Sequence, residues 1–585
     1  MGRLLRYMSL ALSAAAATVA AQEKEGSSWT VGQVVDTSSG SVTGHAASVN
    51  KEVSEYLGIP FAIPPVGDLR WTGPKAYVGT GAINGTDFGF SCPAGSQVSP
   101  NSAAIQAANV TSAGLQILAS LGQIGDRFSE DCLTLNIWTK PQTGESKKAV
   151  LVWIYGGGFT TGNSDNDAYN GQYIAEAEDV VLVSFNYRLN VFGFPGTPNA
   201  TQNLGLLDQR LALEWVRDNI EKFGGDASRI TIFGQSAGSA SVDYHTFAWA
   251  DDPIAHSFIQ QSGSVLGPRG GLGGITADTA AAYWYAAAKV LDCGDRSSDQ
   301  DELLSCMKSK SYQDVIKAIA QGASSGAISS SFGPTVDDKI VFSNYTQLAL
   351  AGKFSKQPLL LGSADNEAGL FRVLDSFKNQ TNSDEYYRTF NDLGFTCPGA
   401  QRAAFSIAQG VPTWRYRWFG AFPNTELTSV PYSGAWHASE LAVLFNNTPS
   451  GGVVPNNTEA EIKIGAYMRG AWAAFAKDPV GGLGSYEEGW PRYVPGRETL
   501  VRLGYQNLTG ANLAVGTMYD GGCKTSFVGG NGTGGSSSGS GSPTTSGSPG
   551  SSPTTVVTSD ARTLQALMSS TLGLSMMLAV GSMFL

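Results

Sequence analysis

The sequence predicts an α/β fold with a mostly parallel central sheet flanked by helices, and two observations support this prediction. Four apolar segments have the length of strands and lack polar alternation, which suits strands buried on both faces of a parallel sheet. A segment of helical periodicity separates two of them. Strand and helix segments therefore alternate along the middle of the chain, as they do in α/β proteins.

The predicted strands and the helix follow one another in a definite order. Strands are expected at 148–155 (KAVLVWIY), 179–185 (DVVLVSF), 229–233 (RITIF) and 357–361 (QPLLL). Between the second and third, a helix over 207–220 places Leu207, Leu211, Trp215 and Val216 on one stripe. The charged residues Asp208, Arg210, Glu214 and Arg217 lie elsewhere on this helix.

Composition narrows the class of protein. The chain has 585 residues, of which 42% are hydrophobic and 15% charged, and its 49 acidic against 38 basic residues give a net charge of −11. This balance argues against nucleic acid as a partner, because phosphate contacts need clustered Lys and Arg. Six cysteines, four histidines and no CxxC pair leave little material for a metal site.

Both ends of the chain have the composition of processing or linker segments. Residues 1–21 have the layout of a secretory signal peptide: Arg3 and Arg6, an apolar run, then small residues. One long region, 28–527, forms the predicted folded domain. Residues 529–560 are nearly all Gly, Ser, Thr and Pro, which predicts a disordered stalk. The apolar tail 564–585 favours a GPI-anchor signal, with a tail-anchored helix or plain secretion as alternatives.

Export to a secreted or cell-surface location predicts glycans and disulfides. Six cysteines suggest three bridges, and spacing alone favours pairing of Cys293 with Cys306. A GPI anchor would be the one contact with a membrane, and nothing in the sequence indicates an oligomeric state. Sequons, expected at the surface if used, occur at Asn84, Asn109, Asn199, Asn344, Asn379, Asn446, Asn456, Asn507 and Asn531.

A GxSxG pattern at 234–238 supplies a candidate nucleophile. The same pattern occurs at 322–326 and 535–539, since a chain this rich in Gly and Ser matches it by chance. Of the three, 234–238 follows an apolar strand directly, and Ala237 opens a plausible helix. A tight strand-to-helix turn holds the serine clear of the sheet, next to the positive end of the helix. Ser236 is therefore the candidate nucleophile.

A serine nucleophile needs a base, and the base needs a carboxylate that orients it. Chain order in this type of site is serine, acid, histidine, so His45 comes too early, while His245 and His256 follow Ser236 too closely. His437 remains as the base. The residues alone leave the acid open between Asp365 and Glu367. The expected oxyanion donors are backbone N–H groups of Ala237 and of the loop 156–158.

Long segments of the chain resemble the type-B carboxylesterase and lipase family, which includes cholinesterases and fungal lipases. The resemblance extends from about 56 to 493. Its matching segments are YLGIPFAIPPVGDLRW (56–71), SEDCLTLNIW (129–138), VWIYGGGF (152–159), NYRLNVFGF (186–194), NLGLLDQRLALEWVRDNIEKFGGD (203–226) and FGQSAGSASV (233–242).

The resemblance implies the α/β-hydrolase fold and hydrolysis of a small-molecule or lipid ester without metal or organic cofactor. It implies Ser236 as nucleophile, Glu367 as acid and His437 as base, with Gly157, Gly158 and Ala237 forming the oxyanion hole. The disulfides it implies are Cys92–Cys132, Cys293–Cys306 and Cys397–Cys523.

Departures from the family bear on the substrate. Gln235 stands where the family usually has Glu, and no tryptophan lies between Cys92 and Cys132, which disfavours a cationic choline substrate. The segment 93–131 is expected to be either a lipase-like lid or an ordinary loop, and Phe332 a core or wall residue. An interfacial lipase is the runner-up function, and a non-catalytic adhesion or binding protein on the same scaffold is a further alternative.

Overall fold

The computed structural model describes most of the predicted folded domain. The predicted signal peptide, the apolar tail, the sequons Asn199 and Asn531, and all but two residues of the predicted stalk lie outside the described residues. The described residues are 29–94, 102–198, 200–268, 271–328, 331–523, 525–526 and 556–557.

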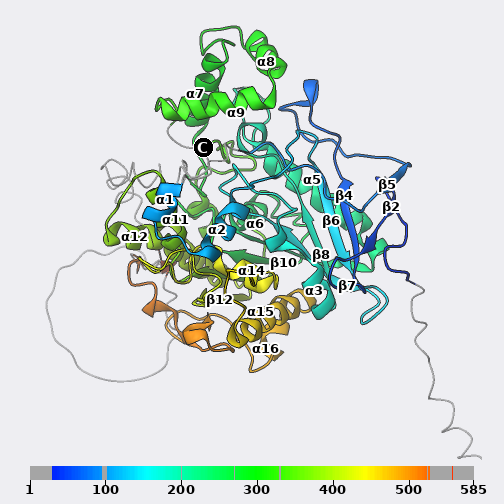
Figure 1. Ribbon diagram of the computed structural model, residues 1–585, viewed down its shortest axis with the longest axis vertical. Coiled ribbons are helices and arrows are strands. Elements are labelled where there is room, and N and C mark those ends of the chain that lie inside the picture. Colours follow the sequence, from blue (N-terminus) through cyan, green and yellow to red (C-terminus); the bar gives the residue numbers. More distant parts are fainter. Residues whose placement is uncertain are drawn as a thin grey trace, which may run out of the picture.

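An 11-stranded sheet forms the centre of the molecule (Figure 1). Neighbouring strands are parallel from β8 (Val181–Phe185) across the sheet to β13 (Glu498–Leu503), and the pairs beyond these two strands, towards both edges, are antiparallel. The prediction of an α/β fold with a mostly parallel central sheet is thus confirmed. In spatial order the strands are β14 (Ala514–Val515), β13 (Glu498–Leu503), β12 (Thr413–Trp418), β11 (Leu359–Ala364), β10 (Ser257–Gln261), β9 (Gly225–Gln235), β7 (Lys148–Ile154), β8 (Val181–Phe185), β6 (Thr134–Thr139), β4 (Ser54–Pro60) and β3 (His45–Ala46).

Two smaller sheets accompany the central one. One consists of β1 (Val35–Thr37), β2 (Gly40–Thr43) and β5 (Ala82–Asn84), and the other pairs β15 (Thr525–Ser526) with β16 (Val556–Val557). The helices are α1 (Ser102–Ala107), α2 (Ser112–Leu121), α3 (Gln172–Glu178), α4 (Asn190–Gly193), α5 (Leu204–Asn219), α6 (Ala237–Ala248), α7 (Ala277–Val290), α8 (Gln300–Ser309), α9 (Tyr312–Ser324), α10 (Tyr345–Leu350), α11 (Ala368–Phe377), α12 (Asp384–Asn391), α13 (Cys397–Ala408), α14 (Ser439–Leu444), α15 (Glu459–Lys477) and α16 (Gly482–Ser485).

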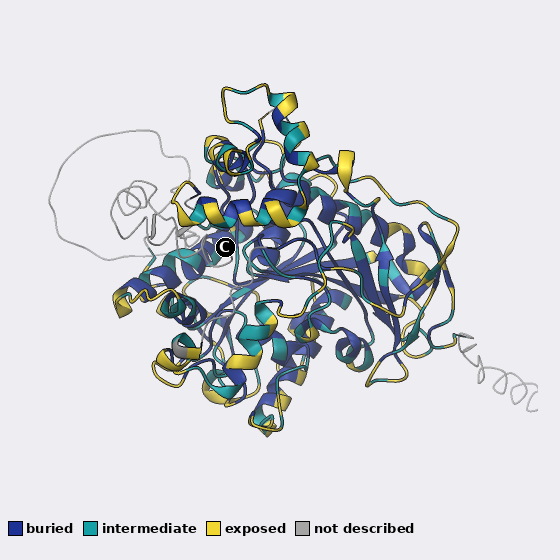
Figure 2. Cartoon of the chain, turned by 45° about the horizontal axis from the view of Figure 1, so that its top comes forward, coloured by how far each residue is buried: buried dark blue, intermediate teal, exposed yellow. Residues whose placement is uncertain are grey.

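Helices cover both faces of the central sheet and bury its strands (Figure 2). Every residue of β7 and β8 is buried, which explains why these strands are continuous apolar runs in the sequence. On one face α5, α6 and α13 are linked by buried polar contacts, such as Arg402 to Asp243. Helices α3 and α15 pack on β6, β7 and β8 from the opposite face.

Helix α5 differs in two respects from its predicted pattern. The stripe residues Trp215 and Val216 are buried as expected, but Leu207 and Leu211 are half-buried. Asp208, expected on the polar side, is fully buried and accepts two hydrogen bonds from the Arg188 guanidinium. Hydrophobic periodicity cannot identify a buried carboxylate whose charge is neutralised by an arginine elsewhere in the chain.

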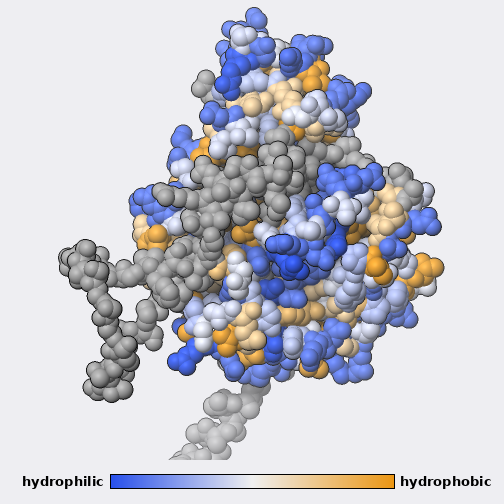
Figure 3. All heavy atoms as spheres, turned by 90° about the vertical axis from the view of Figure 1, so that its left-hand side faces the viewer, coloured by the Kyte–Doolittle hydropathy of each residue, from blue (hydrophilic) through white to orange (hydrophobic). Residues whose placement is uncertain are grey.

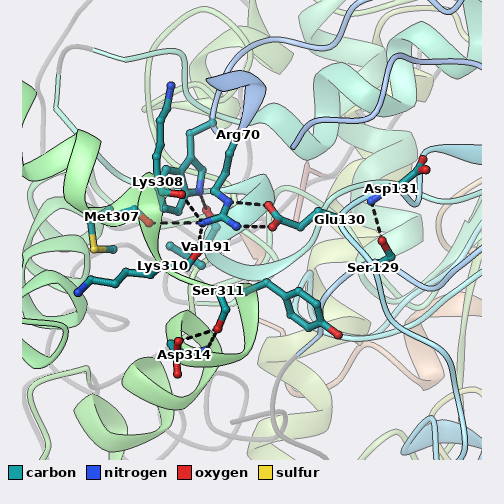
Figure 4. A network of polar contacts seen from close by, with 12 residues as sticks. Arg70, Ser129, Glu130, Asp131, Val191, Met307, Lys308, Lys310, Ser311 and Asp314 are labelled. Carbon is teal, nitrogen blue, oxygen red and sulfur yellow. Dashed lines mark hydrogen bonds and ion pairs between the residues drawn. The ribbon is translucent and has the colours of Figure 1, made fainter. Parts of the chain in front are cut away.

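A second apolar core lies beneath α7, α8 and α9, which project from the sheet at the top of Figure 1. Arg70 fastens this unit to the rest of the domain, as Figure 4 shows. Its guanidinium pairs with Glu130 and donates to the carbonyl oxygens of Met307, Lys308 and Lys310. Such a forked contact suits the planar, permanently charged arginine head group.

The disulfides have the expected pairing, and most of the described sequons lie at the surface. Cystine bridges join Cys92 to Cys132, Cys293 to Cys306 and Cys397 to Cys523, the pairing that the family resemblance implied. Of the seven sequons in the described ranges, Asn446 is half-buried and the rest are exposed. One face of the surface appears in Figure 3, where hydrophobic residues are interspersed with hydrophilic ones. In the described part of the chain, no helix has both the length and the apolarity to cross a membrane.

Candidate active site

Ser236 occupies a strained turn between β9 and α6. Its φ of 59° and ψ of −121° lie where an L-residue is rarely found. The turn is tight because its glycines leave no room: a Cβ on Gly238 would lie 2.0 Å from the carbonyl oxygen of Ile154. A Cβ on Gly234 would lie 2.6 Å from the same oxygen. These two glycines let the serine stand at the end of the buried strand, at the N-terminus of α6.

The other GxSxG match in the described residues has a different setting. Ser324 is the last residue of α9, and the element before α9 is the helix α8 rather than a strand. The third match, 535–539, lies outside the described residues. A strand-turn-helix setting therefore distinguishes Ser236, as the sequence predicted.

His437 and Glu367 are brought together from segments seventy residues apart. Glu367 lies just after β11, at the N-terminus of α11, and is fully buried. Its Oε2 lies 2.5 Å from Nδ1 of His437, while its Oε1 accepts a hydrogen bond from the Ala364 N–H. Asp365, the alternative left open by the residues, instead accepts a hydrogen bond from Arg417. The carboxylate that contacts His437 is thus Glu367.

The other ring nitrogen of His437 faces the residue before the serine. Nε2 of His437 lies 3.2 Å from Nε2 of Gln235, whereas, within the described ranges, Ser236 Oγ makes no hydrogen bond with the ring. Phe371 and Phe395 pack against the imidazole, with ring centroids 5.1 and 4.8 Å from its own. The aromatic neighbours were not foreseen, because nothing in their spacing links them to His437.

The glycine loop after β7 lies beside the serine. A Cβ on Gly156 would lie 2.9 Å from the Cβ of Ser236. Gly157 and Gly158 have φ values of 107° and 61°, a left-handed path that favours glycine. In the part of the chain described, the N–H groups of these two glycines have no hydrogen-bond acceptor. Ala237, the first residue of α6, likewise has no helical partner for its N–H.

A second buried carboxyl group, Glu440, adjoins the pair. It is three residues beyond His437 and fully enclosed. Burial, reinforced by the negative charge of Glu367, raises the pKa of Glu440 to about 8, so this group is neutral at pH 7. Gln261 donates a hydrogen bond to its Oε1. Sequence reasoning missed Glu440, because the groups that act on it, Gln261 at the end of β10 and Glu367 after β11, are distant from it in the sequence.

The remaining histidines have other surroundings. His45 pairs with Glu55 at the edge of the sheet, and Nε2 of His245 contacts Gln209. The pKa of His256 is lowered, mainly by burial. Of the four histidines, all in the described ranges, His437 is the one that contacts both Glu367 and the residue adjoining Ser236.

The segment 93–131 contains two short helices, and α2 packs beside α11. Residues Ile117, Leu118 and Leu121 join an apolar cluster with Leu370, Val373 and Leu427. The preceding turn is fastened by hydrogen bonds from Thr111 N–H to Leu427 O and from Ser112 Oγ to Val453 O. Phe332 is fully buried against Tyr283 in the second core, so it is a core residue.

Comparison with known proteins identifies the family. A family model described as the carboxylesterase family matches residues 31–385, more than half of the chain. The chain belongs to the carboxylesterase family. Its membership confirms the sequence resemblance and makes the protein a carboxylic ester hydrolase with the α/β-hydrolase fold.

Two relatives of this carboxylesterase are fungal enzymes. A chlorogenic acid esterase of Aspergillus niger is 34% identical over 460 residues, which cover 77% of this chain and 84% of the relative. Secreted lipase 5 of Gibberella zeae is 31% identical over 510 residues, covering 82% of this chain and 91% of the relative. Both similarities extend over most of the described domain.

Proposed function

We propose that this carboxylesterase hydrolyses its esters by two-step acyl transfer through Ser236, His437 and Glu367. The observation that carries the proposal is the contact of the buried Glu367 carboxylate with Nδ1 of a histidine that lies beside the strained Ser236 turn. A carboxylate on Nδ1 keeps the ring's proton there, and so leaves Nε2 free to accept one.

In the first step the Oγ of Ser236 attacks the ester carbonyl carbon, and its proton passes to Nε2 of His437. The negative charge on Glu367 stabilises the imidazolium that forms. The carbonyl oxygen gains charge and accepts hydrogen bonds from the N–H groups of Gly157, Gly158 and Ala237. Each such donor is worth on the order of 3 kcal/mol in the transition state.

Departure of the alcohol completes the first step, and water then takes the place of the serine in the second. His437 gives its proton to the leaving alkoxide, which departs as an alcohol and leaves an acyl group on Ser236. Water then attacks the acyl carbon while His437 takes a proton from it, and the acid is released as the serine regains its hydrogen.

Kinetics on a model ester test the nucleophile. Ser236→Ala should lower kcat for p-nitrophenyl butyrate by on the order of 10⁴-fold or more, with an unchanged melting temperature. The matched control is Ser324→Ala, which alters the serine of the other described GxSxG match and should keep full activity. Turnover retained in Ser236→Ala would remove this serine from the mechanism.

For the substrate we favour small soluble esters, supported by the similarity to a chlorogenic acid esterase. The second candidate is an interfacial lipase, because exposed apolar side chains adjoin the 93–131 segment. The exposed apolar side chains are those of Leu115, Val430 and Val453. Leu115 is part of α2, and the other two residues are held next to the segment by hydrogen bonds to their carbonyl oxygens from Asn109 and Ser112.

Tributyrin concentration series separate the two substrate classes. A soluble-ester esterase should saturate below the solubility limit of the triglyceride and show no further rise above it. A lipase would show a jump in rate at that limit, and Val453→Ser would reduce the jump without changing hydrolysis of soluble p-nitrophenyl acetate.

We infer that the chain acts outside the cell. Its three disulfides and its similarity to a relative named as a secreted lipase support this location. Attachment through a GPI anchor at the C-terminal tail is the finer proposal. Release of the enzyme from cells by phosphatidylinositol-specific phospholipase C would support the anchor, and its presence in the medium without treatment would contradict it.

A further inference from the structure

The side chain of Gln235 is the feature of this site that the proposed mechanism does not use. It ends β9, is 3% exposed, and pairs in register with Gln261 at the end of β10. Residues in register on neighbouring parallel strands face the same side of a sheet. The two glutamines therefore lie side by side beneath the segment that carries His437 and Glu440.

Each glutamine holds one residue of that segment. The amide nitrogen of Gln261 donates to Glu440 Oε1 at 3.2 Å, and its oxygen accepts from the indole N–H of Trp472 at 3.1 Å. The amide nitrogen of Gln235 lies 3.2 Å from Nε2 of His437. Its oxygen lies against the glycine loop, 3.2 Å from where a Cβ on Gly156 would be.

The protons on the imidazole determine the direction of the Gln235 contact. An ionised carboxylate accepts hydrogen bonds and cannot donate them. The neutral imidazole therefore keeps its proton on Nδ1, which lies 2.5 Å from the Glu367 carboxylate. Nε2 then carries a lone pair. The amide N–H of Gln235 is a donor, and it points to that lone pair.

We propose that Gln235 is a positioning residue of this esterase, whose amide holds the Nε2 lone pair of neutral His437 until Ser236 replaces it as donor at the start of acylation. This inference rests on the proposed function. The proton that Ser236 Oγ loses goes to Nε2 as the bond from Oγ to the acyl carbon forms. The amide of Gln235 then no longer donates to the ring.

A donor at this position favours the neutral ring over the imidazolium. A hydrogen bond to the neutral form of a group opposes its protonation, whereas a carboxylate within about 4–6 Å favours the charged form. A glutamate at 235, the residue that the family resemblance would lead one to expect here, would place a second carboxylate beside the ring. The amide therefore allows His437 to remain a functional base at lower pH than a glutamate at 235 would allow.

The test compares the wild type with Gln235→Glu and Gln235→Met. The acid limb of the kcat/KM profile should move to higher pH by ~1 unit or more in Gln235→Glu, and by less, in the same direction, in Gln235→Met. Gln209→Glu is the matched control, because Gln209 also contacts a buried histidine, His245, which the mechanism does not use. That control should leave the acid limb where it is.

A second readout needs no catalysis. In protein labelled with ¹³C-histidine, the His437 resonance, assigned through His437→Gln, should titrate at higher pH in both Gln235 variants. Coincident titrations and coincident acid limbs in wild type and Gln235→Glu would overturn the inference. Failure of the proposed function would appear elsewhere, as turnover retained by Ser236→Ala.

Discussion

Two buried histidines of this esterase, His437 and His245, each contact a glutamine, yet their surroundings differ in charge. His245, on α6, donates from Nε2 to Gln209 Oε1, whose own amide nitrogen donates to Ser241. It stacks on Trp249, and within the described ranges its Nδ1 has no hydrogen-bond partner. His437 has a carboxylate on Nδ1 and an amide N–H on Nε2.

The partner of Nδ1 decides what each ring can do. Burial, helped by the positive charge of Arg210, lowers the pKa of His245 to about 3, so this ring is neutral at pH 7. His437 instead has an anion placed to stabilise its imidazolium, which a base needs in the transition state. We propose that the carboxylate on Nδ1, which His245 lacks, is what suits the buried ring of His437 to act as a base.

Exchanging each histidine gives the largest predicted difference. His437→Gln should lower kcat/KM for p-nitrophenyl butyrate by on the order of 10⁴-fold or more, because in the proposed mechanism Nε2 of His437 is the group that accepts the serine proton. His245→Gln should change kcat/KM by less than about threefold and lower the melting temperature instead, because it disturbs a packed buried site. Comparable losses of kcat in the two variants would break the contrast.

Exchanging the two candidate acids gives the next difference. Glu367→Gln should lower kcat by roughly 10³–10⁴-fold, since the ring loses the carboxylate that fixes its tautomer and stabilises its charge. Asp365→Asn should cost less than about tenfold, because Asp365 pairs with Arg417 rather than with the ring. Steady-state kinetics at one pH suffice, and the opposite ranking would assign the acid to Asp365.

Glu440, the buried carboxyl group near His437, should make the folded protein less stable as the pH rises. Glu440 has a pKa of about 8 in the folded chain against 4.5 when unfolded, so the folded state binds the proton more tightly. Stability from this group is complete below pH 4.5 and falls as pH rises towards 8, by at most about 1.4 kcal/mol per pH unit. The melting temperature of Glu440→Gln should therefore rise relative to wild type between pH 5 and 8. A constant difference would contradict this.

His245 should have the opposite effect: it should make the folded protein less stable as the pH falls. Its pKa falls from 6.5 in the unfolded chain to about 3, so its contribution is complete above pH 6.5 and is lost as the pH falls. Between pH 6.5 and 4, wild type should therefore lose melting temperature faster than His245→Gln. Parallel curves for the two proteins would show that this ring is not held neutral.

The apolar strands of the fold could be predicted, and the polar ones could not. Strands β7, β8, β9 and β11 each contain a continuous apolar run and were located within a few residues. Strands β10 (SFIQQ) and β12 (TWRYRW) are just as buried but polar. Their polar side chains find partners in other segments, as Gln260 does with Asp243 on α6 and Arg415 with Asp520. Hydropathy cannot anticipate such partners.

In the candidate site too, some residues could be selected from the sequence, and others depend on contacts made in the folded chain. Chain order and the strand before the turn were enough to select Ser236 and His437. The choice between Asp365 and Glu367 depends on which side chain faces the imidazole of His437. This follows from how the turn after β11 meets the segment before His437, where the N–H of Asn366 donates to the carbonyl oxygen of Ala435. The contact of Gln235 with Nε2 is likewise set by two segments that approach only in the folded chain.

The central claim, that His437 activates Ser236, is tested most directly by covalent labelling. Native enzyme, His437→Gln and His245→Gln are treated with a fluorophosphonate, digested and mapped by mass spectrometry. The account predicts one label per chain on the Ser236 peptide of the native enzyme and of His245→Gln, and almost none in His437→Gln. Labelling of another serine, or equal labelling of Ser236 in all three proteins, would contradict it.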